Sequence, residues 1–591
     1  METLVVAGIY ATTLACGPIL VLGWLEQLRP APLALGTLVL SGAVAGYGAQ
    51  RGGLPTARGH LRACARGLAR VFTSVDTRFV ATLGVVPVGV ILIWTALLSY
   101  LAPPSGWDGL WYHDPIVGFT IQNHGFKWVD VPSKLNLVNG YPKTSEMLSL
   151  WFAIFSGRTL VELPNTLLSP LLIASTYLSM RRLAAERAGA LAVSLVFFLL
   201  PAVALQLRST YVDVTFITFV AATLALLVRP TVRPRDALPI GLGLGLMMGM
   251  KSTGMLLAPL LLGLLLCRTL AFRRSSFPNI ITPFVAGTLM LALGSGYYVR
   301  NGLRTGNPLW PATLTIEGLG IDWEGPVRFD EHQGRTGQRI RDIIAWPDST
   351  QTYYPDVRKH SYGPVLPWSG PLAFAGVLIL LWRCVRDPDR RARRTSKLAL
   401  GTAATLMATV VVSPAWWWAR LNLHAVLGYL ILLAVVLSRL PYRSTVCAGI
   451  VLIAAAAIYP LRSAWGVPTQ TALELARQSP LERAAFRLTP QLPAQTVALA
   501  RERELVAGST VAIINHYTFP GPLWNERYTN RIAYAKWKGT KAFLSRLEAL
   551  GTRWVTVKSG SKQQRAIRKD KGKWQRVGTV SQGHLAYRRT H

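Results

Sequence analysis

The sequence contains few charged residues, and acids are the scarcest of them. Asp, Glu, Lys and Arg make up only 15% of the 591 residues, whereas soluble domains usually carry about 25%. The 28 acids are outnumbered by 63 Lys and Arg, which gives a net charge of +35. These basic residues lie in short clusters between apolar runs and are not gathered on one soluble face. Because nucleic-acid binding needs a basic patch, we expect no nucleic-acid partner.

Cysteine and several common motifs are also scarce. The five cysteines are spread along the chain and show neither zinc-ligand spacing nor a disulfide framework. The N-terminus has no basic stretch and no convincing cleavage site, so we expect the first apolar run to be a retained membrane span and not a signal peptide. The C-terminal tail contains no glycine-rich phosphate loop and no nucleophile motif.

Long apolar runs dominate what is present. Hydrophobic residues make up 51% of the chain, and its mean hydropathy is +0.32. Runs close to the length that crosses a bilayer, about 20 residues, recur along most of the sequence. We therefore predict an α-helical polytopic membrane protein with about 13 transmembrane helices. The predicted spans are 3–24, 32–48, 79–101, 164–180, 189–206, 211–228, 238–250, 252–270, 281–299, 369–383, 398–413, 421–438 and 443–460.

The arginines predict which side of the membrane each loop occupies. Between the second and third spans Arg58, Arg62, Arg66 and Arg70 repeat every fourth residue, which aligns them on one helix face. We expect this cytoplasmic loop to be an amphipathic helix on anionic headgroups or a solvated basic loop. Alternation then puts the later arginine clusters inside and the polar and aromatic segments outside. This assignment requires that the short run 145–156 be re-entrant or interfacial, because a crossing there would invert every later orientation.

The tail after Leu461 is less hydrophobic and predicts a small extracytoplasmic α/β domain. Its order of strand and helix patterns is typical of such a domain. Eleven Lys or Arg and one acid occupy residues 551–591, which suits anionic headgroups, an anionic acceptor or a plain solvated surface. Strands are predicted over 509–515, 553–558, 574–580 and 584–589, and a helix over 541–550. The predicted parts are an N-terminal hairpin with its basic loop, a transmembrane catalytic domain and this tail, over 1–78, 79–461 and 462–591.

The segment WDGLWYHDP, residues 107–115, follows the third predicted span directly. Its Asp108, His113 and Asp114 stand where a helix leaves the bilayer, and ionisable groups there are more often functional than not. A carboxylate in this place can act as a general base towards a hydroxyl or can bind a divalent metal. Asp108, His113, Asp114 and Asp213 would suit Mg or Mn, although their spacing is not diagnostic. The alternative is a helix-capping Asp within an aromatic belt.

Later segments bring more charged residues to the same predicted side. RSTYVDV places Asp213 at the start of an apolar run, and GMKSTG places Lys251 between two apolar half-runs. YYVRNGLRTGNPLWP carries Arg300 and Arg304 after a span, and WWWARLNLH carries Arg420 beside an aromatic belt. Lysine and arginine can hold a lipid-linked phosphate. The alternatives are a helix-dipole role for the acid, snorkelling for the lysine and interfacial anchoring for the arginines, which is favoured for Arg420.

The order of these segments resembles that of the membrane-embedded GT-C glycosyltransferases, which include protein mannosyltransferases, the aminoarabinose transferase of lipid A and oligosaccharyltransferases. WDGLWYHDP resembles the first outer loop of bacterial members, where an Asp is followed by Tyr-His. NGYPKTSEMLSLWFAIFSG, residues 139–157, resembles the tyrosine–proline segment and short helix that come next. The resemblance covers roughly residues 79–590. The family's adjacent acidic pair is absent because Gly109 follows Asp108, which leaves open whether Asp114 or Asp213 supplies the second acid.

The resemblance implies an inverting glycosyltransferase that uses a polyprenyl-phosphate-linked hexose or pentose as donor. A lipid, glycan or protein would be the acceptor, in a bacterial inner membrane whose lipids surround an outward-facing site. Asp108 would be the catalytic acid/base, with Asp213 or Asp114 as the second acid. The residues expected to bind substrate are Tyr112, His113, Tyr141, Lys251, Arg300, Arg304 and Arg420.

Two other classes stay possible at this point. One is a polytopic transporter or lipid flippase, and the other is a non-catalytic membrane scaffold whose tail binds a partner. Transporters tend to show repeated halves and midplane polar residues, whereas this chain shows no internal repeat and its ionisable residues lie at span ends. An outer cavity where Asp108, Lys251 and Arg300 approach one another would favour the enzyme.

Overall fold

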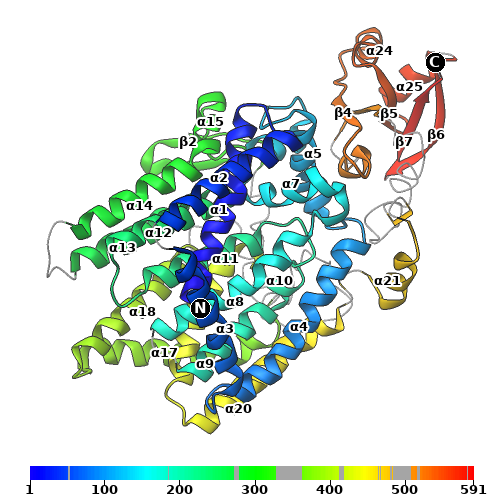
Figure 1. The fold of residues 1–591 in the computed structure, drawn as a ribbon. Helices are drawn as coiled ribbons and strands as arrows, with labels where there is room; N and C mark the ends of the chain where they lie inside the picture. The colour runs from blue at the N-terminus through cyan, green and yellow to red at the C-terminus, as the bar shows by residue number, and fades with distance from the viewer. Residues whose placement is uncertain are drawn as a thin grey trace.

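A computed structural model shows a bundle of helices with a small sheet domain at one corner (Figure 1). Among the described residues, seven helices are long and apolar enough to cross a membrane. They are α1 (Glu2–Trp24), α2 (Pro30–Gln50), α4 (Arg78–Leu101), α13 (Thr253–Ala271), α17 (Val365–Arg386), α19 (Leu423–Leu437) with the preceding turn η7 (Ala419–Asn422), and α20 (Tyr442–Arg462). The structure describes residues 1–50, 53–183, 186–271, 278–327, 362–410, 418–463, 465, 467–479, 482–483, 508–515, 519–570, 572–581 and 583–590.

The remaining predicted spans also form helices, in places with different ends. The span predicted over 189–206 breaks into α9 (Arg187–Leu199) and α10 (Pro201–Ala204), because Pro201 cannot donate a backbone hydrogen bond. The span predicted over 281–299 breaks into α14 (Pro278–Gly294) and the amphipathic α15 (Gly296–Thr305). The others are α8 (Leu163–Leu183), α11 (Asp213–Leu227), α12 (Ala237–Met250) and α18 (Arg390–Ala408). The chain is therefore an integral, multi-pass helical membrane protein, and its number of crossings stays a prediction.

The first helix is packed into the bundle. Val5 and Ile9 of α1 are fully buried in the main apolar core, with α11 and α12. Trp151 of α7 (Thr144–Ser156) donates a hydrogen bond to the carbonyl oxygen of Ala15 at 2.7 Å. The domain limits at 78 and 461 stay predictions. Nevertheless α1 packs directly against helices that lie beyond the limit at 78.

Arginines from several predicted inner loops gather at one end of the bundle. Arg182 at the end of α8 and Arg229 after α11 both contact the Glu2 carboxylate. Arg268 near the end of α13 donates to the carbonyl oxygens of Leu227 and Arg229. These contacts support one common side for the clusters, as the alternation predicts. The basic segment before α4 forms α3 (Gly53–Thr73), which agrees with the predicted helix.

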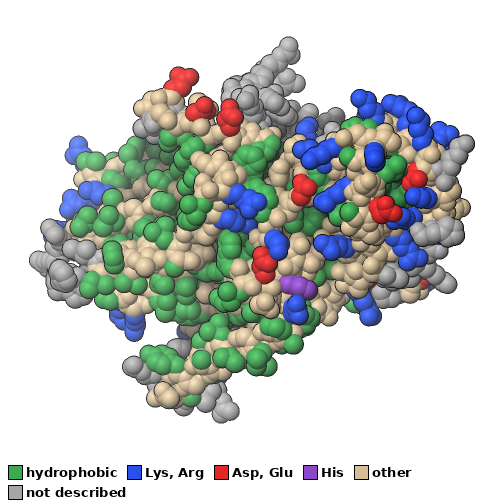
Figure 2. Space-filling view, turned by 90° about the horizontal axis from the view of Figure 1, so that it is seen from above, with side chains coloured by type: hydrophobic (Ala, Val, Ile, Leu, Met, Phe, Trp, Pro, Cys, Tyr) green, Lys and Arg blue, Asp and Glu red, His purple; other side chains and the backbone are tan. Residues whose placement is uncertain are grey.

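The C-terminal domain is a five-stranded sheet in the order β4-β3-β5-β7-β6, which confirms the predicted α/β tail. Strands β3 and β4 run parallel to each other, as do β3 and β5, while β5, β7 and β6 are antiparallel. Lys and Arg gather over this part of the surface in Figure 2. The elements are β3 (Thr510–Ile513), β4 (Arg531–Tyr534), α24 (Thr540–Ala549), β5 (Thr552–Lys558), α25 (Lys562–Lys569), β6 (Trp574–Ser581) and β7 (His584–Arg589); β4 and α25 were not predicted.

The segment between α4 and α8 forms the end of the bundle nearest the sheet domain. WDGLWYHDP folds into a π-turn, η1 (Gly109–His113), that continues into α5 (Asp114–Gln122). Near the two ends of α7, Glu146 contacts His113 and Arg158 contacts Asp114. Because His113 and Asp114 are neighbours, these contacts support the prediction that α7 lies along the membrane boundary and does not cross.

Candidate active site

Asp108 is a buried carboxylate held at the start of the π-turn. Its backbone N–H donates to the Tyr211 hydroxyl at 3.1 Å, and its Oδ2 accepts from Tyr112 at 3.3 Å and from the Arg420 guanidinium. Only 6% of Asp108 is exposed. A Cβ on Gly109 would lie 2.7 Å from Thr210 Oγ1. The π-turn passes so close to Thr210 that position 109 has no room for a side chain. This is a physical reason why no second acid follows Asp108.

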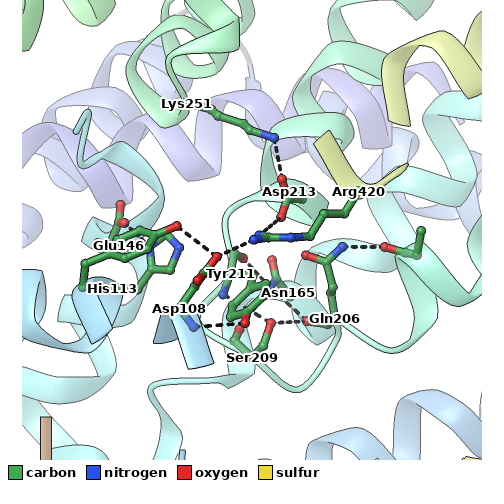
Figure 3. Close-up of polar contacts among 12 residues, drawn as sticks. Asp108, His113, Glu146, Asn165, Gln206, Ser209, Tyr211, Asp213, Lys251 and Arg420 are labelled. Atoms are coloured by element: carbon green, nitrogen blue, oxygen red, sulfur yellow. Dashed lines mark hydrogen bonds and ion pairs between the residues drawn. The ribbon is translucent and has the colours of Figure 1, made fainter. Parts of the chain in front are cut away.

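Asp108 belongs to a group of four charged residues that we call the polar quartet: Asp108, Asp213, Lys251 and Arg420 (Figure 3). Arg420 Nη1 donates to Asp213 Oδ2 at 3.0 Å, while its Nη2 contacts Asp108. Lys251 Nζ stands 2.5 Å from Asp213 Oδ1. Asp213 begins α11, Lys251 follows α12 and Arg420 lies in η7. Two acids and two bases therefore meet at helix ends and balance in charge, which satisfies the need to pair buried ions.

Arg420 was expected to anchor the protein at the interface, and the structure corrects that expectation. It is 5% exposed and bridges two carboxylates. Its guanidinium carbon lies 4.6 Å from the centre of the Tyr211 ring and 4.7 Å from that of Trp418. The neighbouring Trp416 and Trp417 fall outside the described residues. The aromatic run that suggested anchoring thus includes a ring that packs on the guanidinium.

The turn beneath the quartet is fixed by Asn165 of α8. Its side-chain amide donates to the carbonyl oxygens of Gln206, Ser209 and Tyr211 at 2.8–3.2 Å. Thr215 in turn donates to Asn165 Oδ1 at 2.6 Å. A buried amide with these bonds holds the backbone before Asp213 in one conformation. Neither Asn165 nor Tyr211 was a predicted site residue, because a supporting role through backbone carbonyls leaves no local sequence signal.

Tyr112, His113 and Tyr141 form an aromatic layer beside Asp108. His113 Nδ1 lies 2.6 Å from Glu146 Oε1, and both residues are buried. The Tyr112 ring centre lies 4.2 Å from that of His113 and 5.4 Å from that of Tyr141. Burial, reinforced by the Asp108 charge, raises the pKa of both tyrosine hydroxyls. They therefore remain protonated donors at neutral pH.

Lys143 is a buried lysine that sequence reasoning missed. Its Nζ donates to the carbonyl oxygens of Asn139 at 3.1 Å and Tyr141 at 2.9 Å, and it lies 5.3 Å from the Tyr297 ring centre. Burial, together with the charge of Arg300, lowers its pKa well below the ordinary lysine value. Lys143 lies in NGYPKTSEM, which is singled out in the sequence by its resemblance to a family segment. A lysine in that segment could therefore have been named as a candidate site residue.

Asp114, one of the two candidates for a second acid, is separated from the quartet. Its Oδ2 lies 2.5 Å from Arg158 Nη2, and its Oδ1 accepts from the Tyr528 hydroxyl at 2.8 Å. The residue is 0% exposed. The π-turn and the start of α5 direct Asp108 towards the bundle and Asp114 towards the C-terminal domain, so of the two candidates it is Asp213 that shares Arg420 with Asp108.

Arg300 and Arg304 also lie apart from the quartet. Arg300 donates to the carbonyl oxygens of Phe126 and Asn139, and its guanidinium carbon lies 5.5–5.6 Å from the ring centres of Trp24, Trp128 and Tyr297. Both arginines line two adjoining hollows of about 640 and 400 Å³. The approach of Arg300 to Asp108 and Lys251 that would have favoured the enzyme is not found, because α15 directs Arg300 towards α1 and the 126–140 loop.

The four candidate metal ligands do not fit a shared divalent cation. His113 pairs with Glu146 and Asp114 with Arg158, while Asp108 and Asp213 both face the Arg420 guanidinium. Within the described part of the chain, no group of three or more His, Cys, Asp or Glu is arranged to hold a metal ion. A cation placed between Asp108 and Asp213 would meet a fixed positive charge.

The fold and the buried acid–base group define a polytopic membrane protein with a site at the ends of its helices. Residues 142–298 match the family model described as dolichyl-phosphate-mannose-protein mannosyltransferase. The matched range contains Asp213 and Lys251 of the quartet. This match confirms the resemblance to the GT-C membrane glycosyltransferases within that range. No curated protein matches the chain.

The chain is also similar to solved structures of low sequence identity. One is ArnT from Cupriavidus metallidurans bound to undecaprenyl phosphate, with 13% identity, a TM-score of 0.45, and 86% of this chain and 98% of that chain covered. Another is the Archaeoglobus fulgidus oligosaccharyltransferase, with 13% identity, a TM-score of 0.40 and coverages of 88% and 75%. A third is the arabinofuranosyltransferase AftD from Mycobacteria, with 14% identity, a TM-score of 0.44 and coverages of 86% and 41%.

Proposed function

We propose that this chain is an inverting glycosyltransferase that takes a sugar from a polyprenyl-phosphate donor in a bacterial inner membrane. The observation that carries the proposal is the polar quartet. It offers an oriented carboxylate and two cations at one end of a helical membrane bundle, in a chain whose residues 142–298 match a mannosyltransferase family model. The acceptor is a hydroxyl on a lipid, glycan or protein at the outer face.

Asp108 is the proposed general base. Tyr112 and Arg420 both bind its Oδ2, and Oδ1 has no hydrogen-bond partner that the described residues supply. Oδ1 can therefore take the proton of the acceptor hydroxyl. As the acceptor oxygen bonds to the anomeric carbon from one side, the bond from that carbon to the phosphate oxygen breaks on the other. The products are an inverted glycoside, a polyprenyl phosphate and protonated Asp108.

The departing phosphate gains negative charge, which the quartet's cations can stabilise. Lys251 and Arg420 are the proposed phosphate partners, because electrostatic groups fixed in advance stabilise charge that develops in the transition state. Asp213 contacts both cations and positions them. Since the candidate ligands do not fit a divalent cation, no step of this scheme runs through a metal.

The test is sugar transfer by the full chain in proteoliposomes. A panel of undecaprenyl-phosphate hexoses and pentoses is supplied with envelope extract as acceptor, and released undecaprenyl phosphate is measured. Wild type should release it from one donor class, and Asp108→Asn should lower that rate by about 100- to 10,000-fold. Asp130→Asn alters an exposed acid of the 126–140 loop and should retain the wild-type rate. Full activity of Asp108→Asn at equal protein level would refute the assignment.

A further inference from the structure

Part of the C-terminal domain, residues 519–532, lies directly on the loop that carries Asp108. The rings of Trp107 and Phe519 meet edge to face with their centres 4.8 Å apart. Phe119 and Trp524 meet in the same way, also at 4.8 Å. Trp524 is fully buried although it belongs to a different domain from the helix it covers. Aromatic side chains of the C-terminal domain thus contact both the start of this loop and the helix α5 that follows it.

A buried ion pair and hydrogen bond fasten the two parts together at Asp114. Arg158, just after α7, and Tyr528 of the C-terminal domain each bind one oxygen of that carboxylate. Beside them, Thr159 donates to Glu526 Oε1 at 2.7 Å, and the Arg158 backbone N–H donates to the Glu526 carbonyl oxygen at 2.9 Å. Removing one partner from such a buried charge leaves the other without compensation, so these contacts are costly to break.

The end of α5 is tied to the edge of the sheet domain in the manner of a paired strand. Gln122 Nε2 donates to the Ile532 carbonyl oxygen at 3.0 Å, and its Oε1 accepts the Ile532 N–H at 2.8 Å. Trp524 Nε1 donates to the same Gln122 oxygen at 3.1 Å. One amide side chain therefore satisfies both backbone groups of Ile532 within the edge strand β4, an arrangement that requires a fixed distance between α5 and the sheet.

Three glycines permit this close approach. A Cβ on Gly521 would overlap Asp114 Oδ2, and one on Gly118 would overlap the Trp524 ring. Gly157 has a φ of +69°, which favours glycine, and a Cβ there would overlap the Glu526 carbonyl oxygen. Both sides of the interface thus lack side chains where they come closest, which indicates tight docking and not a loose encounter.

We propose that Asp114 is a positioning residue for the proposed reaction, and that residues 519–532 are a structural part of the active site. The inference rests on the proposed function. Asp108 begins the π-turn and Asp114 ends it, so one continuous helical segment connects the two carboxylates. The quartet holds one end of this segment and Arg158 with Tyr528 holds the other. The C-terminal domain thereby fixes the direction in which Asp108 Oδ1 faces the acceptor.

The test compares two hydroxyl deletions within the C-terminal domain of the full-length chain. Tyr528→Phe removes the bond to Asp114. Tyr587→Phe removes a buried hydroxyl that binds Gln564 on the far side of the sheet, so it is a matched control for loss of domain stability. The donor is the undecaprenyl-phosphate hexose or pentose that the wild-type chain consumes, and kcat and KM are measured separately. Amide hydrogen exchange over residues 107–122 is measured in parallel on detergent-solubilised protein.

We expect Tyr528→Phe and Asp114→Asn to lower kcat about tenfold with an unchanged donor KM, because small displacements of a reacting group are costly. Both should speed amide exchange over residues 107–122, whereas Tyr587→Phe should match wild type in both measurements. Arg158→Lys should keep more activity than Arg158→Gln, because it retains the positive charge. A kcat for Tyr528→Phe and Asp114→Asn equal to that of Tyr587→Phe would overturn the positioning role, even if exchange were faster.

The exchange measurement also separates this inference from the proposed function. If wild type consumed none of the undecaprenyl-phosphate donors, the proposed function would be overturned, and with it the catalytic meaning of the position of Asp108. Unchanged exchange in Asp114→Asn would overturn the inference on its own, since it would show that the contact does not fix the loop.

Discussion

Asp108 and Asp114 lie in one short loop, but they join two different networks. Asp108 enters the polar quartet, where its carboxylate shares Arg420 with Asp213, and its Oδ1 has no hydrogen-bond partner among the described residues. Asp114 has both oxygens bound, by Arg158 and by Tyr528. The comparison teaches that a buried acid with an unbound oxygen is suited to proton transfer, whereas a fully bound one is suited to holding structure.

The largest expected effect comes from removing the cation that two acids share. Arg420→Gln leaves Asp108 and Asp213 without their common guanidinium, and we expect a loss of about 3–5 kcal/mol in stability together with the loss of sugar transfer. The Tm of the purified protein and the release of undecaprenyl phosphate measure the two effects.

A second substitution sharpens this result. Adding Asp108→Asn to Arg420→Gln removes the carboxylate that the loss of Arg420 leaves without a cation, while the Lys251–Asp213 pair stays intact, so it should recover part of the Tm while transfer stays lost. A double variant that regains transfer would show that the quartet serves stability alone and that its cations do not act on the phosphate.

A medium effect is expected where Asp114 meets the C-terminal domain. Gly521→Ala places a methyl group against Asp114 Oδ2, and overpacking of this kind costs about 1–3 kcal/mol. We expect earlier proteolysis of the C-terminal domain in the full chain. Gly578→Ala is the matched control, since a Cβ there meets nothing within 4 Å. Equal protease resistance of the two variants would show that the interface can yield at no cost.

The smallest expected effect is a pH dependence at the same interface. Burial raises the pKa of Glu526 above its ordinary value of 4.5, against the opposing effects of Thr159 and Arg158. An acid whose pKa is raised by folding stabilises the folded state below its unfolded pKa, and this contribution is lost as the pH rises through the folded pKa. The Tm should therefore fall over that window.

Two variants isolate the Glu526 contribution. Glu526→Gln cannot titrate, so its Tm should change less with pH than that of wild type. Glu548→Gln, at an exposed acid of α24, should keep the wild-type slope. A Glu526→Gln protein with an unaltered slope would assign the pH dependence to another group.

Much of the fold could be predicted, because long apolar runs and alternating strands are local signals. The predicted helix over 541–550 and the strands over 553–558 and 584–589 correspond closely to α24, β5 and β7. Strand β4 was missed because it follows the polar Thr529 and Asn530 and begins with Arg531, whereas β3, of the same length, lies in the apolar run VAII. The break between α9 and α10 had a local signal, Pro201 itself. It was overlooked because the apolar run continues on both sides of the proline.

The site was harder to predict because its partners come from distant segments. Asp108, Asp213, Lys251 and Arg420 were all singled out from the sequence, but only the fold pairs them. Tyr528 lies in another domain from Asp114, and no spacing rule connects them. Chemistry-bearing residue types at helix ends are thus visible in a single sequence, whereas the choice of partner is a property of the packed structure.

The glycine-lined contact between α5 and the C-terminal domain limits how the protein can be shortened. A chain cut before β3 would retain every member of the quartet and every membrane helix. It would also leave Trp107, Phe119 and Asp114 facing water, with one carboxylate oxygen unbound. Such a fragment is a poor substitute for the whole protein in a ligand screen. It lacks Phe519 and Trp524, so compounds that act by displacing these side chains from the loop would not be found.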